Sequence, residues 1–488
     1  MTGTTRGGRE PLAASAPLLA AYLAAASRDR APFSVPGHKG RSEALDTGLG
    51  LAADTDVPLF GGLDAMKLTA GTLTRAEALA AELWQADWCR FSVGGATQAN
   101  QALLLAAGRP GDQVIMARSI HRSVFSGLVL AGLRPVWLPP RSDPVSTLPL
   151  GPDPAGLAAA FDAAPGAVAV WITEPSYLGT VADVAGLAEV AHARGAPLLV
   201  DQAWGAHFGF AGGYPPHALA AGADAMVIST HKMLPAYSQA ALVLARDGYL
   251  PPGRLAAAFD ATNTTSPAGA ILASSDGARA LLAVRGAELL GRLATLVAGA
   301  RDSFTKACPG LAAPGPADFP PGRFDPAKLV LSLAGCGADG TVAELAAEAA
   351  GLPLEMADRD TIVATVTVAD TAATIGRLAD VLGGAIAAGT GPPRPAAIGV
   401  SWTLAPEPMI DPRTAFFAPW TAVPADEAAG RASAELIAAY PPGVPILAPG
   451  ELITPALLGA LRQQAAEGSR IAYAADPSLR TLRVLDAS

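Results

Sequence analysis

The chain has 488 residues, of which 51% are hydrophobic and 16% are charged, and its formal net charge is −9. This length and composition predict two or three domains with a large buried core and exclude a mostly disordered chain. The acidic balance argues against a nucleic-acid partner, and three widely spaced cysteines without a disulfide or zinc pattern favour a reducing cytoplasm.

The N-terminal region contains an uncharged run, Pro11 to Ser27, which follows two arginines and superficially resembles a signal peptide. The run is rich in alanine and is followed at once by a charged triplet at 28–30. We therefore predict a helix over Pro17–Ser27, and no later apolar run is long enough to span a bilayer. Two prolines and two glycines over 32–40 then predict an extended arm or loop.

A helix is predicted over Leu73–Ala86, with Thr74 as its cap and Glu77 as the capping-box partner. The strand Arg90–Val93 follows, then small residues over 94–97 and an apolar helix. Free backbone N–H groups at that helix start would form an anion cradle, although a plain tight turn explains the same residues equally well.

Strands then alternate with helices up to Ala245. This rhythm predicts an α/β fold with βαβ units and a mainly parallel sheet that helices cover on both faces. The predicted strands are residues 90–93, 112–117, 134–138, 167–172, 197–201, a β-branched run ending at Ser229, and 240–245.

Polar side chains follow the ends of these strands, where α/β proteins keep their functional groups. Each one alone has an ordinary structural explanation, such as a helix cap, a turn hydroxyl, a loop histidine or a solvated cation. Their convergence on one edge of the sheet favours a shared site. The residues are Thr97, His121, Ser176, Asp201, Ser229, His231 and Lys232.

These groups suit an aldehyde cofactor that carries a phosphate and a pyridine ring. The small-residue loop with Thr97 and Ser229 would hold the phosphate, and Asp201 would keep the ring nitrogen protonated. His121 could stack on the ring, and a buried Lys232 could form a Schiff base with the aldehyde.

Beyond Asn263 the regular alternation of predicted strands and helices ends. A turn over 264–267 precedes a long helix predicted over Ala270–Val297, and Pro-rich stretches flank a smaller α/β unit near 329–388. We expect four parts: an N-terminal helix and arm (1–50), a cofactor-binding large domain (51–269), a small α/β domain (270–390) and a C-terminal domain (391–488).

The sequence resembles the fold-type I pyridoxal-phosphate enzymes, and specifically the small form of the Orn/Lys/Arg decarboxylases. The resemblance runs from near residue 17 to about 460 and is carried by PFSVPGHKG, VGGATQAN, SIHRS, EPSYLG, VDQAWGAHFGF, STHKMLPAYSQAA, TTSP and YPPGVPILAPGE. It implies an aspartate-aminotransferase-like large domain followed by smaller C-terminal α/β domains.

The resemblance also implies roles for single residues. Lys232 would be the Schiff-base lysine, His231 its partner near the reacting carbon, Asp201 the partner of the ring nitrogen, and His121 the side chain stacked on the ring. Ser266 would reach across a dimer to the neighbouring cofactor. The implied cofactor-binding set is Gly95, Ala96, Thr97, His121, Ser176, Asp201, Ala203, Ser229, His231, Lys232 and Ser266.

Three places depart from the family pattern. Ala96 replaces a hydroxyl in the phosphate loop, Gln202 replaces a glutamate, and residues 60–67 lack the expected acidic and histidine-bearing segment.

The resemblance implies decarboxylation of a basic L-amino acid, arginine before lysine or ornithine, by a cytoplasmic homodimer or larger homo-oligomer. Another pyridoxal-phosphate reaction (transamination, aldol cleavage or oxidation) and a non-catalytic homologue stay open. Candidates for binding the distal cation of the substrate are Glu451, Glu174 and Asp276.

Overall fold

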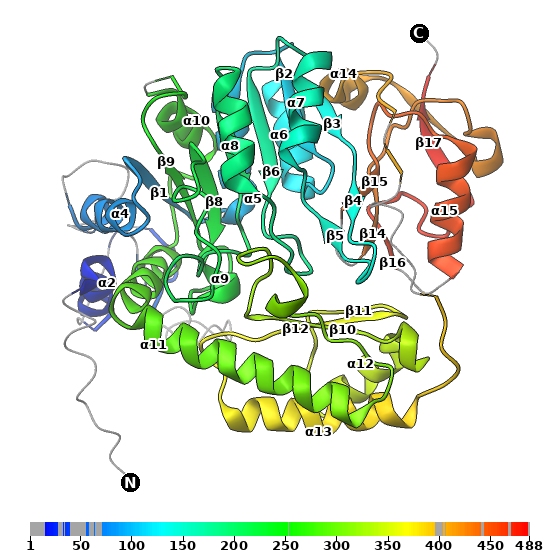
Figure 1. Ribbon diagram of the computed structural model, residues 1–488. Helices are drawn as coiled ribbons and strands as arrows, with labels where there is room; N and C mark the ends of the chain where they lie inside the picture. Colours follow the sequence, from blue (N-terminus) through cyan, green and yellow to red (C-terminus); the bar gives the residue numbers. More distant parts are fainter. Residues whose placement is uncertain are drawn as a thin grey trace.

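The computed structural model describes residues 15–27, 33, 35–39, 55–57, 63, 71–251, 253–395, 404–405, 407–440, 444–466 and 470–486. A large α/β domain forms the upper part of Figure 1, a small sheet with long helices lies below it, and a C-terminal unit lies to one side.

The large domain is built on a seven-stranded sheet in the order β1-β9-β8-β7-β6-β2-β3. Strands β3, β2, β6, β7 and β8 run parallel, whereas β9 is antiparallel to both of its neighbours. The predicted mainly parallel sheet is therefore confirmed. The strands are β1 (Trp88–Ser92), β2 (Gln113–Ala117), β3 (Arg134–Leu138), β6 (Ala169–Thr173), β7 (Leu198–Asp201), β8 (Ala225–Ser229) and β9 (Ala241–Ala245).

Helices cover both faces of this sheet because alternate residues of each strand enter two different hydrophobic cores. In β2, Ile115 packs in one core, and Val114 and Met116 pack in the other. Helices α7 (Pro154–Ala163) and α8 (Val184–Ala193) contribute to the first core. The second core is lined by α5 (Gly95–Ala107), α6 (Arg122–Ala131) and α10 (Arg254–Thr262).

The predicted N-terminal helix is present as α2 (Pro17–Ala26), which packs with α4 (Thr72–Leu83). The predicted cap of α4 is wrong: the helix begins at Thr72, two residues before Thr74, and Gly71 precedes it. The Glu77 carboxylate instead accepts the N–H of Phe91 at 3.0 Å and so joins α4 to β1.

A 39-residue helix, α11 (Gly269–Ala307), extends ten residues beyond its predicted end and runs under the small sheet in Figure 1. The division predicted at residue 269 stays a prediction; α11 begins there. The small unit has strand order β10-β12-β11. Its elements are η4 (Pro316–Asp318), β10 (Lys328–Ser332), η5 (Ala334–Cys336), α12 (Gly340–Ala349), β11 (Met356–Ala357), β12 (Thr361–Thr365) and α13 (Ala372–Ala388).

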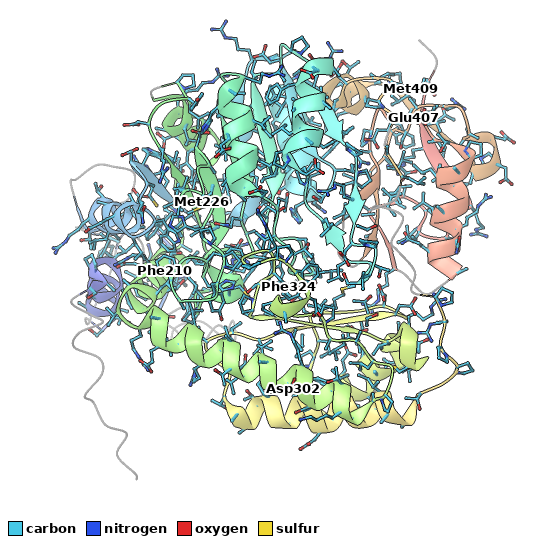
Figure 2. All side chains as sticks on the ribbon, viewed as in Figure 1. Phe210, Met226, Asp302, Phe324, Glu407 and Met409 are labelled. Atoms are coloured by element: carbon cyan, nitrogen blue, oxygen red, sulfur yellow. The ribbon has the colours of Figure 1, made fainter. Side chains whose placement is uncertain are left out.

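The large and small sheets meet at a hydrophobic joint around Phe324, which lies between them in Figure 2. Leu148 and Leu178 join it from the large domain, and Val330 and Val363 from the small sheet. Leu148 lies in the hairpin formed by the antiparallel strands β4 (Arg141–Ser142) and β5 (Pro149–Leu150).

The C-terminal unit lies beside the large domain. No described helix is both long and apolar enough to cross a membrane. The unit contains α14 (Pro412–Phe417), β13 (Trp420–Pro424), η7 (Ala425–Glu427), β14 (Ile437–Tyr440), β15 (Pro445–Leu447), α15 (Pro455–Ala466), β16 (Arg470–Ala472) and β17 (Thr481–Leu485).

Candidate active site

The carboxyl ends of the parallel strands open into a cavity of about 570 Å³. Nine of the predicted site residues line it: Gly95, Ala96, Thr97, His121, Asp201, Ala203, Ser229, His231 and Lys232. Sequence reasoning missed several other lining residues, and those with a role below are Asn100, Tyr177, Trp204 and Val444.

One wall of the cavity fits a phosphate group. Helix α5 starts there at Gly95, whose φ of +68° is accessible to glycine without strain. The Ser229 hydroxyl lines the same cavity, is fully buried, and has no hydrogen-bond partner within the described part of the chain. Because an unpaired buried hydroxyl is costly, this group fits a phosphate oxygen together with Thr97 and the positive end of α5.

Asp201 lies buried at the tip of β7 and is held by two hydrogen bonds. Its Oδ1 accepts the N–H of Ala203 at 3.1 Å, and its Oδ2 accepts from Asn100 Nδ2 at 2.8 Å. Asn100 also donates to Ser123 Oγ at 3.1 Å. The spacing of Asn100 three residues after Thr97, on the same side of α5, is the signal that would have found it.

The two cavity histidines are held in opposite tautomers. Nδ1 of His121 accepts the N–H of Ser123 at 3.2 Å, so the ring proton lies on Nε2. Nδ1 of His231 donates to the carbonyl of Ala240 at 2.8 Å, so its Nε2 is an acceptor when the ring is neutral. Burial lowers the pKa of both rings, and Asp201 partly opposes the decrease at His121.

Lys232 lies in the short helix α9 (Thr230–Met233) and is partly buried at the cavity wall. Its Nζ is 4.5 Å from the centre of the Trp204 indole. Burial lowers the pKa of Lys232, while the carboxylates of Asp201 and Glu355 act in the opposite direction. The environment is therefore that of a reactive amine and not of a solvated surface cation.

Trp204 is packed edge-on against Tyr177, with ring centres 5.4 Å apart. Both aromatic rings come from loops that follow strands, Tyr177 after β6 and Trp204 after β7. The motifs EPSYLG and VDQAWGAHFGF contain these two residues, but the sequence analysis predicted no role for either ring. The signal that would have found Trp204 is an aromatic side chain three residues after Asp201.

Two predicted cofactor ligands do not line the cavity. Ser176 Oγ pairs with Thr180 Oγ1 at 2.7 Å, so it stabilises its own turn. Ser266 is exposed beside Thr264, and its role at a neighbouring subunit stays a prediction. Of the divergent segment 60–67, only Leu63 is among the described residues. The divergent Gln202 is buried away from the lining and accepts the N–H of Ala218 at 3.0 Å.

The three carboxylates considered for the distal end of the substrate have structural partners instead, and none lines the cavity. Glu451 forms a buried ion pair with Arg118 at 2.6 Å. Glu174 accepts the N–H of Ala182 at 2.9 Å, and burial raises its pKa to about 8. Asp276 accepts the N–H of Leu18 at 2.8 Å.

Comparison with known proteins agrees with this geometry. Residues 16–313 match the family described as Orn/Lys/Arg decarboxylase, major domain, and residues 401–465 match its C-terminal domain. The chain is 32% identical to an arginine decarboxylase of Halalkalibacterium halodurans over 484 residues, 96% of this chain and 97% of the relative. It is 30% identical to an arginine decarboxylase of Bacillus subtilis over 482 residues, with the same coverage of 96% and 97%.

The fold resembles that of lysine decarboxylase A from Pseudomonas aeruginosa, with a TM-score of 0.80 at 20% identity, covering 99% of this chain and 82% of that one. The family match spans more than half of the chain, and the fold agrees with it. The chain therefore belongs to the Orn/Lys/Arg decarboxylases, a family of pyridoxal-phosphate-dependent carboxy-lyases with the type I fold.

Proposed function

We propose that this protein decarboxylates arginine, with lysine and ornithine as the next candidates, and that Lys232 carries the cofactor. The observation that supports the assignment of Lys232 is a single cavity that joins this amine to the carboxylate of Asp201 and to the hydroxyl of Ser229, which has no partner among the described residues. The preference for arginine rests on the two relatives named arginine decarboxylases, which match 96% of the chain.

Pyridoxal phosphate, when bound, supplies an electron sink for the pair of electrons that remains when CO₂ leaves. Ser229, Thr97 and the first N–H groups of α5 would hold its phosphate. Asp201 would hold a proton on the ring nitrogen, and Asn100 fixes the carboxylate for that task.

The reacting carbon needs one proton after CO₂ has left, and we assign that donation to Lys232. His231 is less suited, because its Nδ1 proton is bonded to the Ala240 carbonyl and its Nε2 carries none in the neutral ring. A lowered pKa also makes the Lys232 ammonium a better acid than an exposed lysine.

Substitution of the lysine and product analysis test the proposal together. Lys232→Ala should abolish the visible absorbance of the bound cofactor and all turnover, whereas Lys306→Ala, at an exposed lysine of α11, should change neither. Mass spectrometry of wild-type products should give one amine and one CO₂ per arginine consumed. Absorbance retained in Lys232→Ala, or keto acid as the main product, would contradict it.

We further propose a homodimer in which Ser266 completes the partner's site. Support comes from its exposed position outside the cavity of its own chain. Mixing inactive Lys232→Ala with an inactive Ser266→Trp protein should restore part of the activity through hybrid dimers, and no recovery would argue against a shared site.

We also propose a cytoplasmic location, because the cysteines Cys89, Cys308 and Cys336 are all unpaired and buried. Cell fractionation followed by immunodetection would test this location, and recovery of the protein from an oxidising compartment would contradict it.

A further inference from the structure

A second lysine lies behind the cavity wall. Lys328 is the first residue of β10, and only 2% of its surface is exposed. Its Nζ has no hydrogen-bond partner in the described ranges and lies 3.9 Å from the centre of the Trp204 indole. The same indole has Lys232 Nζ 4.5 Å from its centre, so one aromatic ring is shared by two amines.

The surroundings hold Lys328 in place without a direct hydrogen bond from its Nζ to a carboxylate in the described ranges. Its stem packs on Gly179, where a Cβ would lie 2.8 Å from the lysine Cγ. Asp325 is the acidic residue of the small domain nearest to Lys328 in the sequence. Its carboxylate already accepts a hydrogen bond from Nε2 of His207 at 3.0 Å. Glu355 is exposed and accepts from the Tyr177 hydroxyl at 2.8 Å.

Burial of the two amines favours an incompletely protonated state, although the nearby carboxylates act against it. Burial lowers the pKa of Lys328 to about 8, Asp325 and Glu355 oppose that decrease, and the charge of Lys232 adds to it. On the cavity side, Lys232 is near Asp201, His121 and His231. Because two like charges in one poorly hydrated site disfavour each other, a charge on either amine disfavours protonation of the other.

We propose that Lys328 is a positioning residue for Lys232: held against the same indole, its charge favours the neutral, nucleophilic form of the amine that takes the cofactor. The inference rests on the proposed function, in which Lys232 is that amine. A purely structural side chain of similar size would fill the same space without acting on the neighbouring proton.

The test measures the proton on Lys232 directly. Full-length protein freed of cofactor is labelled with trace acetic anhydride across a pH series, and the Lys232 peptide is quantified by mass spectrometry. The labelling midpoint is the pH at which labelling of Lys232 is half-maximal. Lys328→Met should raise this midpoint by roughly one pH unit. Lys328→Arg, which stays charged, should leave the midpoint at or below that of wild type, and the exposed control Lys306→Met should leave it unchanged.

The labelling midpoints of the variants support or overturn the proposed role of Lys328. A folded Lys328→Met protein with an unchanged midpoint overturns the proposal; if that variant does not fold, a raised midpoint in Lys328→Arg overturns it. Glu355→Gln, at an exposed position, should lower the midpoint because a negative neighbour of both amines is lost. Labelling needs no cofactor, so it stays readable even if Lys232→Ala retains the cofactor absorbance and the proposed function fails.

Discussion

Asn100 controls how firmly the carboxylate of Asp201 is held, because its amide donates to Oδ2 at 2.8 Å inside a buried site. Asn100→Ala should lower kcat/KM about tenfold, which corresponds to the loss of one hydrogen bond to a charged group. Steady-state kinetics would measure this. The neighbouring Gln101→Ala is the control, since that side chain bonds to Ser126 outside the cavity, and an equal loss in both variants would contradict the role of Asn100.

His217 links stability to pH through its burial, which lowers its pKa from 6.5 to about 4, with Arg246 adding to the effect. The unfolded chain binds a proton at this ring below pH 6.5, whereas the folded protein does not bind one until about pH 4. Stability should therefore fall as the pH drops from 6.5 towards 4, by up to about 3 kcal/mol.

Denaturant titration of wild type and His217→Gln across that range would check this prediction. The difference between their free energies of unfolding should change with pH and flatten above pH 7. A difference that is constant with pH would contradict it.

At the scale of elements, α2 depends on a carboxylate from another helix. Asp276 of α11 accepts the N–H groups of Leu18 and Leu19, and it also pairs with Arg279. Asp276→Ala should destabilise the docked α2 by about 1–2 kcal/mol through loss of this cap, and it should destabilise α11 in addition because the buried Arg279 loses its carboxylate. Hydrogen exchange over 17–26 should quicken about tenfold, whereas Asp302→Ala, at an exposed position on the same helix (Figure 2), should leave the exchange unchanged.

The elements that the sequence predicted well are those with strong local patterns. The strands ending at Asp201 and Ser229 are apolar runs bounded by turns, so their residues and their shared edge followed from periodicity. The capping role of Thr74 was wrong because β1 recruits the Glu77 carboxylate. Lys328 was missed because a lysine that opens a strand has no local feature that distinguishes it from a solvated cation.

On the scale of the whole molecule, the C-terminal unit is joined to the large domain by the buried pair Arg118–Glu451, which also holds the Ile446 carbonyl. Glu451→Gln should cost about 3–5 kcal/mol because it leaves the guanidinium buried and unpaired. KM should rise as well, since the same segment contributes Val444 to the cavity wall.

Thermal unfolding and kinetics of Glu451→Gln, compared with the double variant Arg118→Met/Glu451→Met, would check this. The double variant should recover most of the stability, because neither charge is left without its partner. The exposed pair Arg285–Glu288 serves as the control, and a comparable loss in Glu288→Gln would contradict the special importance of the buried pair.

The shared indole of Trp204 has a mechanical consequence. Trp204 and Lys232 are attached to the large sheet, whereas Lys328 is attached to the small one. Any hinge motion that parts the two sheets must therefore change the field at the reactive nitrogen. Under the proposed role of Lys328, the absorbance of bound pyridoxal phosphate would then report the separation of the large and small sheets.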